Sequence, residues 1–170
     1  MNKGLLHLYT GDGKGKTTAA MGLAFRALGC GKSVVVVQFL KGTPTGEVIM
    51  LKQAGVKVFR EESIVKFVFQ MTEQEKKDAQ KKYNQLLQDA IQEPADLLIL
   101  DEACAACELK MVEESLLQQV VLNRNPNTEV VLTGRNPANW MIEAADYYIE
   151  MKCHKHPYEQ GIPARKGIEF

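Results

Sequence analysis

Short apolar runs alternate with longer segments of helical periodicity along the whole chain. Runs with the length and composition of strands cover residues 5–9, 33–39, 56–59, 96–100, 129–133 and 146–151. Helical patterns separate them, over about 16–28, 72–91 and 111–122 and from 136 onward. The run of four valines at 34–37 is typical of a parallel strand buried on both faces. The alternation predicts an α/β fold of three layers, in which helices flank a mostly parallel central sheet.

Capping residues mark several ends of these elements. Thr72 and Glu75 form a capping-box pattern at the start of the long helix. Gly29 follows the last apolar residue of the first helix and is expected to end it. Asn136 and Pro137 resemble a helix cap and an entry proline, so a further helix is expected to begin there.

Glycine and proline concentrate in two other segments. Residues 41–46 are expected to form a loop at the carboxyl edge of the sheet, where open α/β sheets bind ligands. Residues 152–170 are expected to form an irregular tail. The chain carries neither an internal repeat nor a linker-like stretch, so we expect residues 1–170 to form one domain.

The composition is that of an ordinary globular protein, with 45% hydrophobic residues and 21 acidic side chains against 21 basic ones. This balance favours neither nucleic acid nor an anionic membrane as a partner, and no apolar run is long enough to span a bilayer. Cys104 and Cys107 form a lone CxxC without a second pair to complete a zinc site. Buried thiols in a reducing compartment are the simpler interpretation, and a cytoplasmic location is expected.

The strongest candidate chemistry follows the first apolar run. A glycine-rich turn there leads directly into a helix, and its residues are Thr10, Gly11, Asp12, Gly13, Lys14, Gly15, Lys16, Thr17 and Thr18. Small residues let backbone N–H groups converge on a phosphate, while a lysine reaches the outer phosphates. The first glycine comes one residue late for the usual P-loop spacing. The pattern nevertheless predicts a nucleoside triphosphate site.

A second group of candidates follows later strands. Asp101 and Glu102 come directly after an apolar strand, where their carboxylates would hold Mg²⁺ or Mn²⁺ together with the Thr17 hydroxyl. Alternatively, the acidic pair caps the next helix, or one carboxylate polarises a water molecule. Arg135 follows the strand at 129–133 and is a candidate phosphate ligand or an ordinary surface arginine.

Phe67 and Phe69 alternate with Lys66 and Val68 as in a buried strand, or else they lie in a loop and present their rings to a flat ligand. The site residues by themselves leave three reactions open. The predicted phosphate-binding site could serve transfer of the γ-phosphoryl group, hydrolysis, or expulsion of the whole triphosphate when a nucleophile attacks the 5′ carbon.

A family resemblance chooses among these reactions. The turn at 10–18 resembles the phosphate loop of the P-loop ATP:corrinoid adenosyltransferases, which share its late first glycine and the lysine at the place of Lys14. The segments at 36–42, 100–102 and 131–135 are similar to the family's next motifs in the same order. The end of the chain is the most specific part, with matches at 145–146, 150–151, 155–158 and 166–170.

The resemblance implies a P-loop NTPase-like fold and an enzyme that transfers the 5′-deoxyadenosyl group of ATP to the Co(I) of a reduced corrinoid, releasing triphosphate. Lys16, Thr17 and Glu102 would be catalytic, the loop and Arg135 would bind ATP, and Phe67 and Phe69 would press against the lower face of the corrin. Apolar rings there would displace the lower axial ligand and favour four-coordinate cobalt.

The resemblance also implies a homodimer and an electron donor such as a reduced flavoprotein. Well-known members have a longer N-terminal helix that helps to cover the corrinoid, whereas nine residues precede Thr10 here. The competing classes are a regulatory P-loop NTPase or nucleotide-binding module and a small-molecule kinase.

Overall fold

The computed structural model describes residues 3–43, 45–64 and 66–169. Pro44, Val65 and Phe170 lie outside these ranges, so the loop at 41–46, the run at 65–69 and the motif at 166–170 are described only in part. Six parallel strands form one sheet in the order β3-β2-β4-β5-β1-β6. The strands are β1 (Leu6–Thr10), β2 (Val34–Gln38), β3 (Lys57–Arg60), β4 (Leu97–Asp101), β5 (Glu129–Thr133) and β6 (Tyr147–Glu150).

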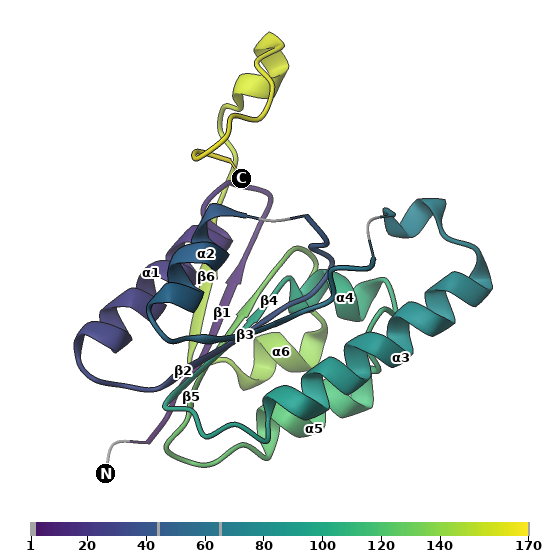
Figure 1. Cartoon of the computed structure of the whole chain (residues 1–170). Coiled ribbons are helices and arrows are strands. Elements are labelled where there is room, and N and C mark those ends of the chain that lie inside the picture. The colour runs from purple at the N-terminus through teal and green to yellow at the C-terminus, as the bar shows by residue number, and fades with distance from the viewer. Residues whose placement is uncertain (1–2, 44, 65, 170) are drawn as a thin grey trace.

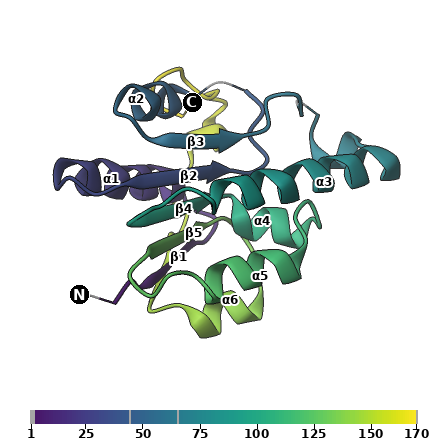
Figure 2. The same cartoon turned by 60° about the horizontal axis from the view of Figure 1, so that its bottom comes forward.

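Helices cover both faces of this sheet, which confirms the expected three layers (Figures 1 and 2). The first face is covered by α1 (Lys16–Gly29) and α2 (Gly46–Gln53), and the second by α3 (Glu73–Ala90), α4 (Ala103–Glu108), α5 (Glu114–Leu122) and α6 (Asn139–Ala144). In β2, Val34 and Val36 pack in the core beneath α1, whereas Val35 and Val37 pack in the core beneath α3. The period of two along a strand therefore fills two separate cores from one valine run.

The expected capping box at the start of α3 is confirmed. The Thr72 hydroxyl accepts a hydrogen bond from the backbone N–H of Glu75, and the Glu75 carboxylate accepts one from the N–H of Thr72. Two N–H groups that the helix leaves unpaired are thereby satisfied. The end of α1 is also close to expectation, because Gly29 is its last residue, although Gly31 is the residue that takes the left-handed conformation, with φ of 73°.

Two expected helix starts were wrong, and one of the two alternatives for Phe67 and Phe69 is excluded. Helix α6 begins at Asn139 rather than at 136, and its N-cap is Ala138, because Asn136 has a φ of 50° that no helix accepts. Helix α5 begins at Glu114 rather than at 111, since Met111 is buried in the core ahead of it. The segment after residue 66 is not a core strand but a loop that carries a 3₁₀ turn, η1 (Val68–Gln70).

The tail is irregular, as expected, apart from a 3₁₀ turn, η2 (Pro157–Gln160). It continues from the outermost strand β6 and projects beyond the body of the fold before turning back (Figure 1). In the part of the chain that the structure describes, the helices lack the combination of length and apolar character that a membrane span needs.

Candidate active site

The glycine-rich turn connects β1 to α1 at the carboxyl edge of the sheet. Gly11 and Gly15 have φ angles of 103° and 117°, a conformation that L side chains rarely adopt. The backbone of β6 continues beside the turn, and the N–H of Gly13 donates to the carbonyl of Met151 at 2.7 Å. Backbone geometry therefore explains why glycine occupies these places in the loop.

We expect the substitution Gly11→Ala to lower the free energy of unfolding by about 2–3 kcal/mol, since it combines a positive φ with a collision. A Cβ at this position would lie 2.3 Å from the Met151 carbonyl oxygen. The matched control is Gly22→Ala in the interior of α1, where a Cβ meets nothing within 4 Å and helix propensity favours alanine. Thermal or denaturant unfolding measures both. Equal stability of the two variants would contradict the close approach of the two backbones.

Lys16 is the first residue of α1, and its ammonium donates to the carbonyl of Gly13 at 2.7 Å. Burial and the neighbouring Arg135 lower the pKa of Lys16, while Glu102, Asp12 and Asp101 act in the opposite direction. The Arg135 guanidinium in turn donates to the backbone carbonyl of Asp12 at 3.3 Å. Two cations are thus held near each other at the phosphate loop, and a bound polyphosphate would relieve their repulsion.

Asp101 lies at the centre of the site and is completely buried. Its Oδ1 accepts hydrogen bonds from the hydroxyls of Thr17 at 2.9 Å and Thr133 at 2.7 Å. Its Oδ2 accepts from the Lys41 ammonium at 2.6 Å and from the Gln38 amide at 3.2 Å. Although β5 separates β1 from β4 in the sheet, the start of α1 brings Thr17 to this carboxylate, so the predicted pair of oxygens is assembled.

Glu102 occupies the N-cap position of α4, in a left-handed conformation with φ of 61°. Its side chain makes no capping hydrogen bond, so the capping interpretation holds for its backbone and not for its carboxylate. Burial, followed by the nearby Asp101, raises the pKa of Glu102. Its backbone N–H donates a hydrogen bond to the Thr133 hydroxyl, which in turn donates one to the Asp101 carboxylate.

Lys41 was missed as a site residue by the sequence analysis. Its ammonium lies 3.0 Å from the Thr17 hydroxyl oxygen, in addition to its contact with Asp101. The available signal was its place three residues after the end of β2, in the loop at 41–46 expected at the ligand-binding edge of the sheet. Sequence alone could not show that the side chain turns inward.

Apart from Gly13, the predicted ATP ligands line two cavities at the phosphate loop. One, of about 580 Å³, is lined by Lys14, Gly15, Lys16, Thr17 and Thr18 together with Lys41, Glu102 and the tail residues Gly167 to Glu169. The other, of about 500 Å³, is lined by Thr10, Gly11, Asp12 and Arg135 and by residues at the start of the tail. The volume of the first is adequate for a nucleotide, and it contains the lysines and the hydroxyl expected to bind phosphate.

The tail contacts the phosphate loop at both of its ends. The backbone N–H of Cys153 donates to the Asp12 carboxylate at 3.0 Å, and this bond lowers the pKa of Asp12. Near the end of the described chain, the Lys14 ammonium donates to the carbonyl of Ile168 at 3.3 Å. The distinctive terminal motif therefore forms part of the wall of the site.

Phe67 and Phe69 are exposed, with 68% and 82% of their surface accessible. Their rings stack on each other, with centroids 5.5 Å apart and an angle of 9° between the planes. Of the two alternatives, the structure bears out the loop that presents apolar rings outward. The two rings therefore form an exposed apolar surface at this position.

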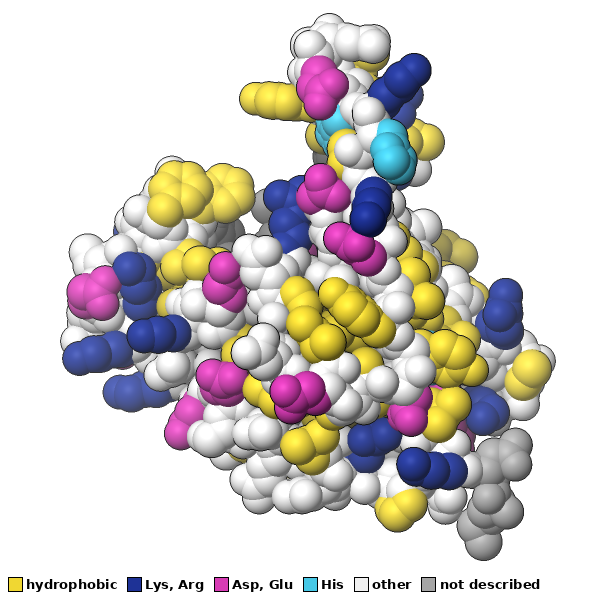
Figure 3. Space-filling model, turned by 180° about the vertical axis from the view of Figure 1, so that it is seen from behind, with side chains coloured by type: hydrophobic (Ala, Val, Ile, Leu, Met, Phe, Trp, Pro, Cys, Tyr) yellow, Lys and Arg dark blue, Asp and Glu magenta, His cyan; other side chains and the backbone are white. Residues whose placement is uncertain are grey.

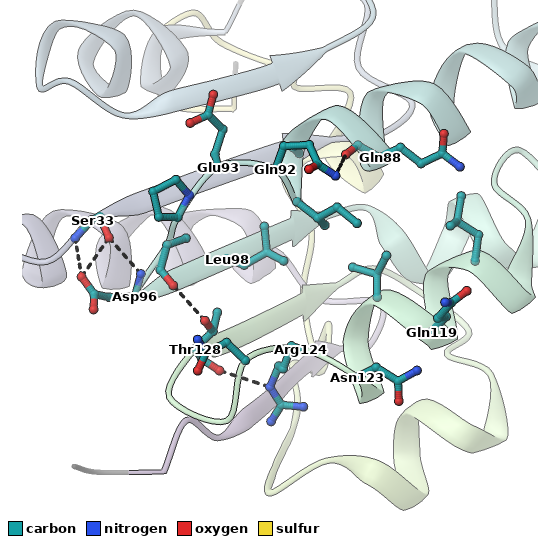
Figure 4. Close-up of a pocket in the computed structure, with 17 residues that line it drawn as sticks. Ser33, Gln88, Gln92, Glu93, Asp96, Leu98, Gln119, Asn123, Arg124 and Thr128 are labelled. Carbon is teal, nitrogen blue, oxygen red and sulfur yellow. Dashed lines mark hydrogen bonds between the residues drawn. The ribbon is translucent and has the colours of Figure 1, made fainter.

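A third cavity, of about 810 Å³, lies at the opposite edge of the sheet (Figure 4). Several of its polar side chains join the loops at this edge through hydrogen bonds. The Asp96 carboxylate accepts from both the backbone N–H and the hydroxyl of Ser33, and the Thr128 hydroxyl donates to the carbonyl of Ala95. This cavity is larger than the one beside the phosphate loop, but it lacks the cluster of lysines that lines that cavity.

The two thiols of the CxxC pair are buried on α4. Burial raises the pKa of Cys104 to about 12 and that of Cys107 to about 11, which keeps both protonated near neutral pH. Among the described residues, no group of three or more His, Cys, Asp or Glu side chains is arranged to hold a metal ion. The buried, unreactive interpretation of these cysteines therefore fits the structure.

A glycine-rich turn of this geometry at the carboxyl edge of a parallel sheet, facing a buried strand-end carboxylate, defines a P-loop nucleotide-binding protein. The comparisons with known proteins narrow the class. The family model of ATP:corrinoid adenosyltransferase BtuR/CobO/CobP matches residues 2–170, and the chain belongs to this family of transferases.

Curated relatives agree over almost the full length. A corrinoid adenosyltransferase of Escherichia coli (strain K12) is 35% identical over an alignment of 176 positions. The alignment covers 99% of this chain and 86% of the relative. Corrinoid adenosyltransferase CobA of Salmonella typhimurium (strain LT2) is 34% identical, with the same coverage of 99% and 86%. A corrinoid adenosyltransferase from Sinorhizobium sp is 34% identical and covers 99% of this chain and 81% of the relative. A regulatory NTPase or a small-molecule kinase is not favoured by these matches.

Proposed function

We propose that this protein transfers the 5′-deoxyadenosyl group of ATP to the cobalt of a reduced corrinoid. Membership of the adenosyltransferase family over residues 2–170 carries the proposal, and the intact phosphate loop supports it. In the proposed step, Co(I) of the corrinoid substrate donates an electron pair to the 5′ carbon. The bond between that carbon and the triphosphate oxygen breaks, and its electron pair leaves with triphosphate, while the cobalt becomes alkyl-Co(III).

The chain's own residues would act mainly on the leaving group. Lys16 and Lys14 reach into the cavity of about 580 Å³ from the phosphate loop. Their ammonium groups would neutralise charge that develops on the departing triphosphate, which is where preorganised cations lower a barrier most effectively. The Arg135 guanidinium would hold the rest of the phosphate chain, together with the backbone N–H groups of the loop other than that of Gly13, which donates to Met151.

The residues around Asp101 fit a divalent cation such as Mg²⁺ or Mn²⁺. The Asp101 carboxylate and the Thr17 hydroxyl are hard oxygen donors, and both already contact an ammonium cation, that of Lys41. Gln38 Oε1 is buried beside them without a hydrogen-bond partner in the described ranges, and a water molecule of a hydrated cation would satisfy it. We propose Thr17, Asp101 and Glu102 as the groups that hold the metal, which would neutralise phosphate charge.

The enzymatic test uses purified protein, ATP, a divalent cation and chemically reduced cobalamin. We expect a light-sensitive cobalt–carbon product and one intact triphosphate for each product formed. Release of orthophosphate or ADP, without a light-sensitive product, would overturn the proposed function in favour of a hydrolase or a kinase.

Phe67 and Phe69 are proposed to contact the corrin. We expect the double substitution Phe67→Ala and Phe69→Ala to lower the corrinoid-dependent rate at least about tenfold, because the apolar stack that would displace the lower ligand is lost. ATP affinity should stay within about twofold, and stability should change by less than about 0.5 kcal/mol since both rings are exposed.

The matched control for the phenylalanine pair is Leu122→Ala, which removes an exposed apolar side chain from α5. Product formation at saturating ATP gives the rate, and isothermal titration gives ATP affinity. Weakened ATP binding with an unchanged corrinoid step would remove the two rings from the corrinoid site.

Two partners remain predictions, namely a reduced flavoprotein as electron donor and a second copy of the chain. The edge strand β6 supports self-association, because Tyr147, Tyr148 and Ile149 are each 44–51% exposed. Hydrophobic side chains also gather on the face of the molecule beneath the projecting tail (Figure 3). A cytoplasmic location likewise stays a prediction.

A further inference from the structure

The buried carboxylate of Asp101 is in direct contact with one cationic group, the ammonium of Lys41, among the described residues. Its other three donors are neutral, two hydroxyls and one amide. An isolated carboxylate that is fully removed from water is strongly destabilising, so a counter-charge is needed at this place. Lys41 supplies it in the structure as described.

The Lys41 ammonium lies where a metal ion bound to the Thr17 and Asp101 oxygens would lie. The Thr17 hydroxyl donates a hydrogen bond to Asp101, and its oxygen accepts one from Lys41 Nζ, 3.0 Å away. The same ammonium lies 2.6 Å from Asp101 Oδ2. A divalent cation held by these two oxygens needs the same lone pairs at about 2.0–2.1 Å for Mg²⁺. The two cations therefore compete for one position.

The backbone that carries Lys41 is fixed, whereas its side chain is not enclosed. Arg60, whose side chain is only 3% exposed, donates to the carbonyl of Lys41 at 2.8 Å and also to the carbonyl of Thr43. The Lys41 side chain is 22% exposed and lines the same cavity as Lys16. Replacement of the Lys41 ammonium by a metal ion thus needs only a rotation of the Lys41 side chain toward the space where phosphates would lie. The loop itself need not move.

We propose that Lys41 is a built-in counter-cation, which holds the metal position in the ligand-free protein and is displaced from it when a divalent cation binds. The proposal rests on the metal site included in the proposed function. Lys41 keeps the buried carboxylate paired before substrate arrives, and its displaced ammonium adds a third lysine to the phosphate cavity. Lys41 is therefore a positioning residue that also sets how strongly the site binds metal.

The test compares Lys41→Met with the wild type in the absence of ATP and corrinoid. The substitution removes the charge and keeps a long side chain. Without metal, we expect the melting temperature of the variant to fall on the order of 10 °C, because a buried pair has lost one partner. Added Mg²⁺ should restore much of that loss in the variant and have little effect on the wild type.

Metal binding itself is measured with Mn²⁺ alone, followed by electron paramagnetic resonance. We expect Lys41→Met to bind Mn²⁺ at least about fivefold more tightly than the wild type, since the competing ammonium is gone. Lys52→Met, on the exposed surface of α2, is the matched control and should change neither the melting temperature nor Mn²⁺ binding.

The double variant Lys41→Met with Asp101→Asn keeps the test decisive if the single variant folds poorly. Removal of the unpaired carboxylate should return a large part of the lost melting temperature, as expected for two coupled groups. Unchanged or weaker Mn²⁺ binding in Lys41→Met, or a double variant no more stable than the single one, would overturn the proposal. Because none of these readouts uses catalysis, failure of the proposed adenosyl transfer would be seen separately.

Discussion

The substitution Lys16→Ala is expected to reduce adenosyl transfer by a factor of about 10²–10³ with little loss of stability. Lys16 stands at the start of α1, where its ammonium and the converging N–H groups face the cavity together. Charge grows on the triphosphate only as the bond to the 5′ carbon breaks, so loss of this cation should raise the barrier more than it weakens ATP binding. The initial rate of formation of the light-sensitive product measures the effect.

The control for Lys16 is Lys81→Ala, an exposed lysine on α3 at the far face of the sheet, which should retain full activity. Unfolding of both variants checks that the fold is intact. Burial and the neighbouring Arg135 lower the pKa of Lys16, so its removal relieves repulsion and should not weaken the empty fold. Wild-type turnover by Lys16→Ala would contradict the assigned role in leaving-group stabilisation.

The sequence predicted best those features that a single local pattern determines. The consecutive valines of β2 can all be buried only in a sheet that is covered on both faces. The capping box of Thr72 and Glu75 is sufficient to predict the start of α3. The phosphate loop was recognisable because its glycines meet a local need for positive φ and close backbone approach. The positive φ angles, the capping box and the valine alternation act over a few residues, so the local sequence is sufficient to predict them, whereas the approach of Met151 to the loop is a long-range contact.

The features that the sequence did not predict depend on contacts between distant segments. The helices α2 and α4 are short, with eight and six residues, and their apolar positions are too few to show a period. Lys41 reaches Asp101 across a sequence separation of 60 residues, a contact that no local pattern reveals. The approach of the tail at Ile168 to Lys14 spans 154 residues and was likewise not deduced.

Replacement of Asp101 by asparagine is expected to have the largest combined effect of the substitutions considered. Asp101 is a buried acceptor to which four donors point, from Thr17, Thr133, Gln38 and Lys41. The amide keeps the shape of the carboxylate but removes its charge and places an N–H₂ group against donors. We expect the free energy of unfolding to fall by about 2–4 kcal/mol, because a buried pair is broken and at least one donor loses its acceptor.

The same substitution removes the charge that would bind a divalent cation, so we expect adenosyl transfer to fall by at least about 10³-fold and Mn²⁺ binding to be lost. The matched control is Asp96→Asn at the opposite end of β4. Its carboxylate pairs with Ser33 at the edge of the sheet away from the phosphate loop, and the variant should keep both activity and metal binding. Retention of metal-dependent turnover by Asp101→Asn would show that the cation is held elsewhere. The buried carboxylate would then serve the fold alone, as the acceptor that joins the ends of β2, β4 and β5 to the start of α1.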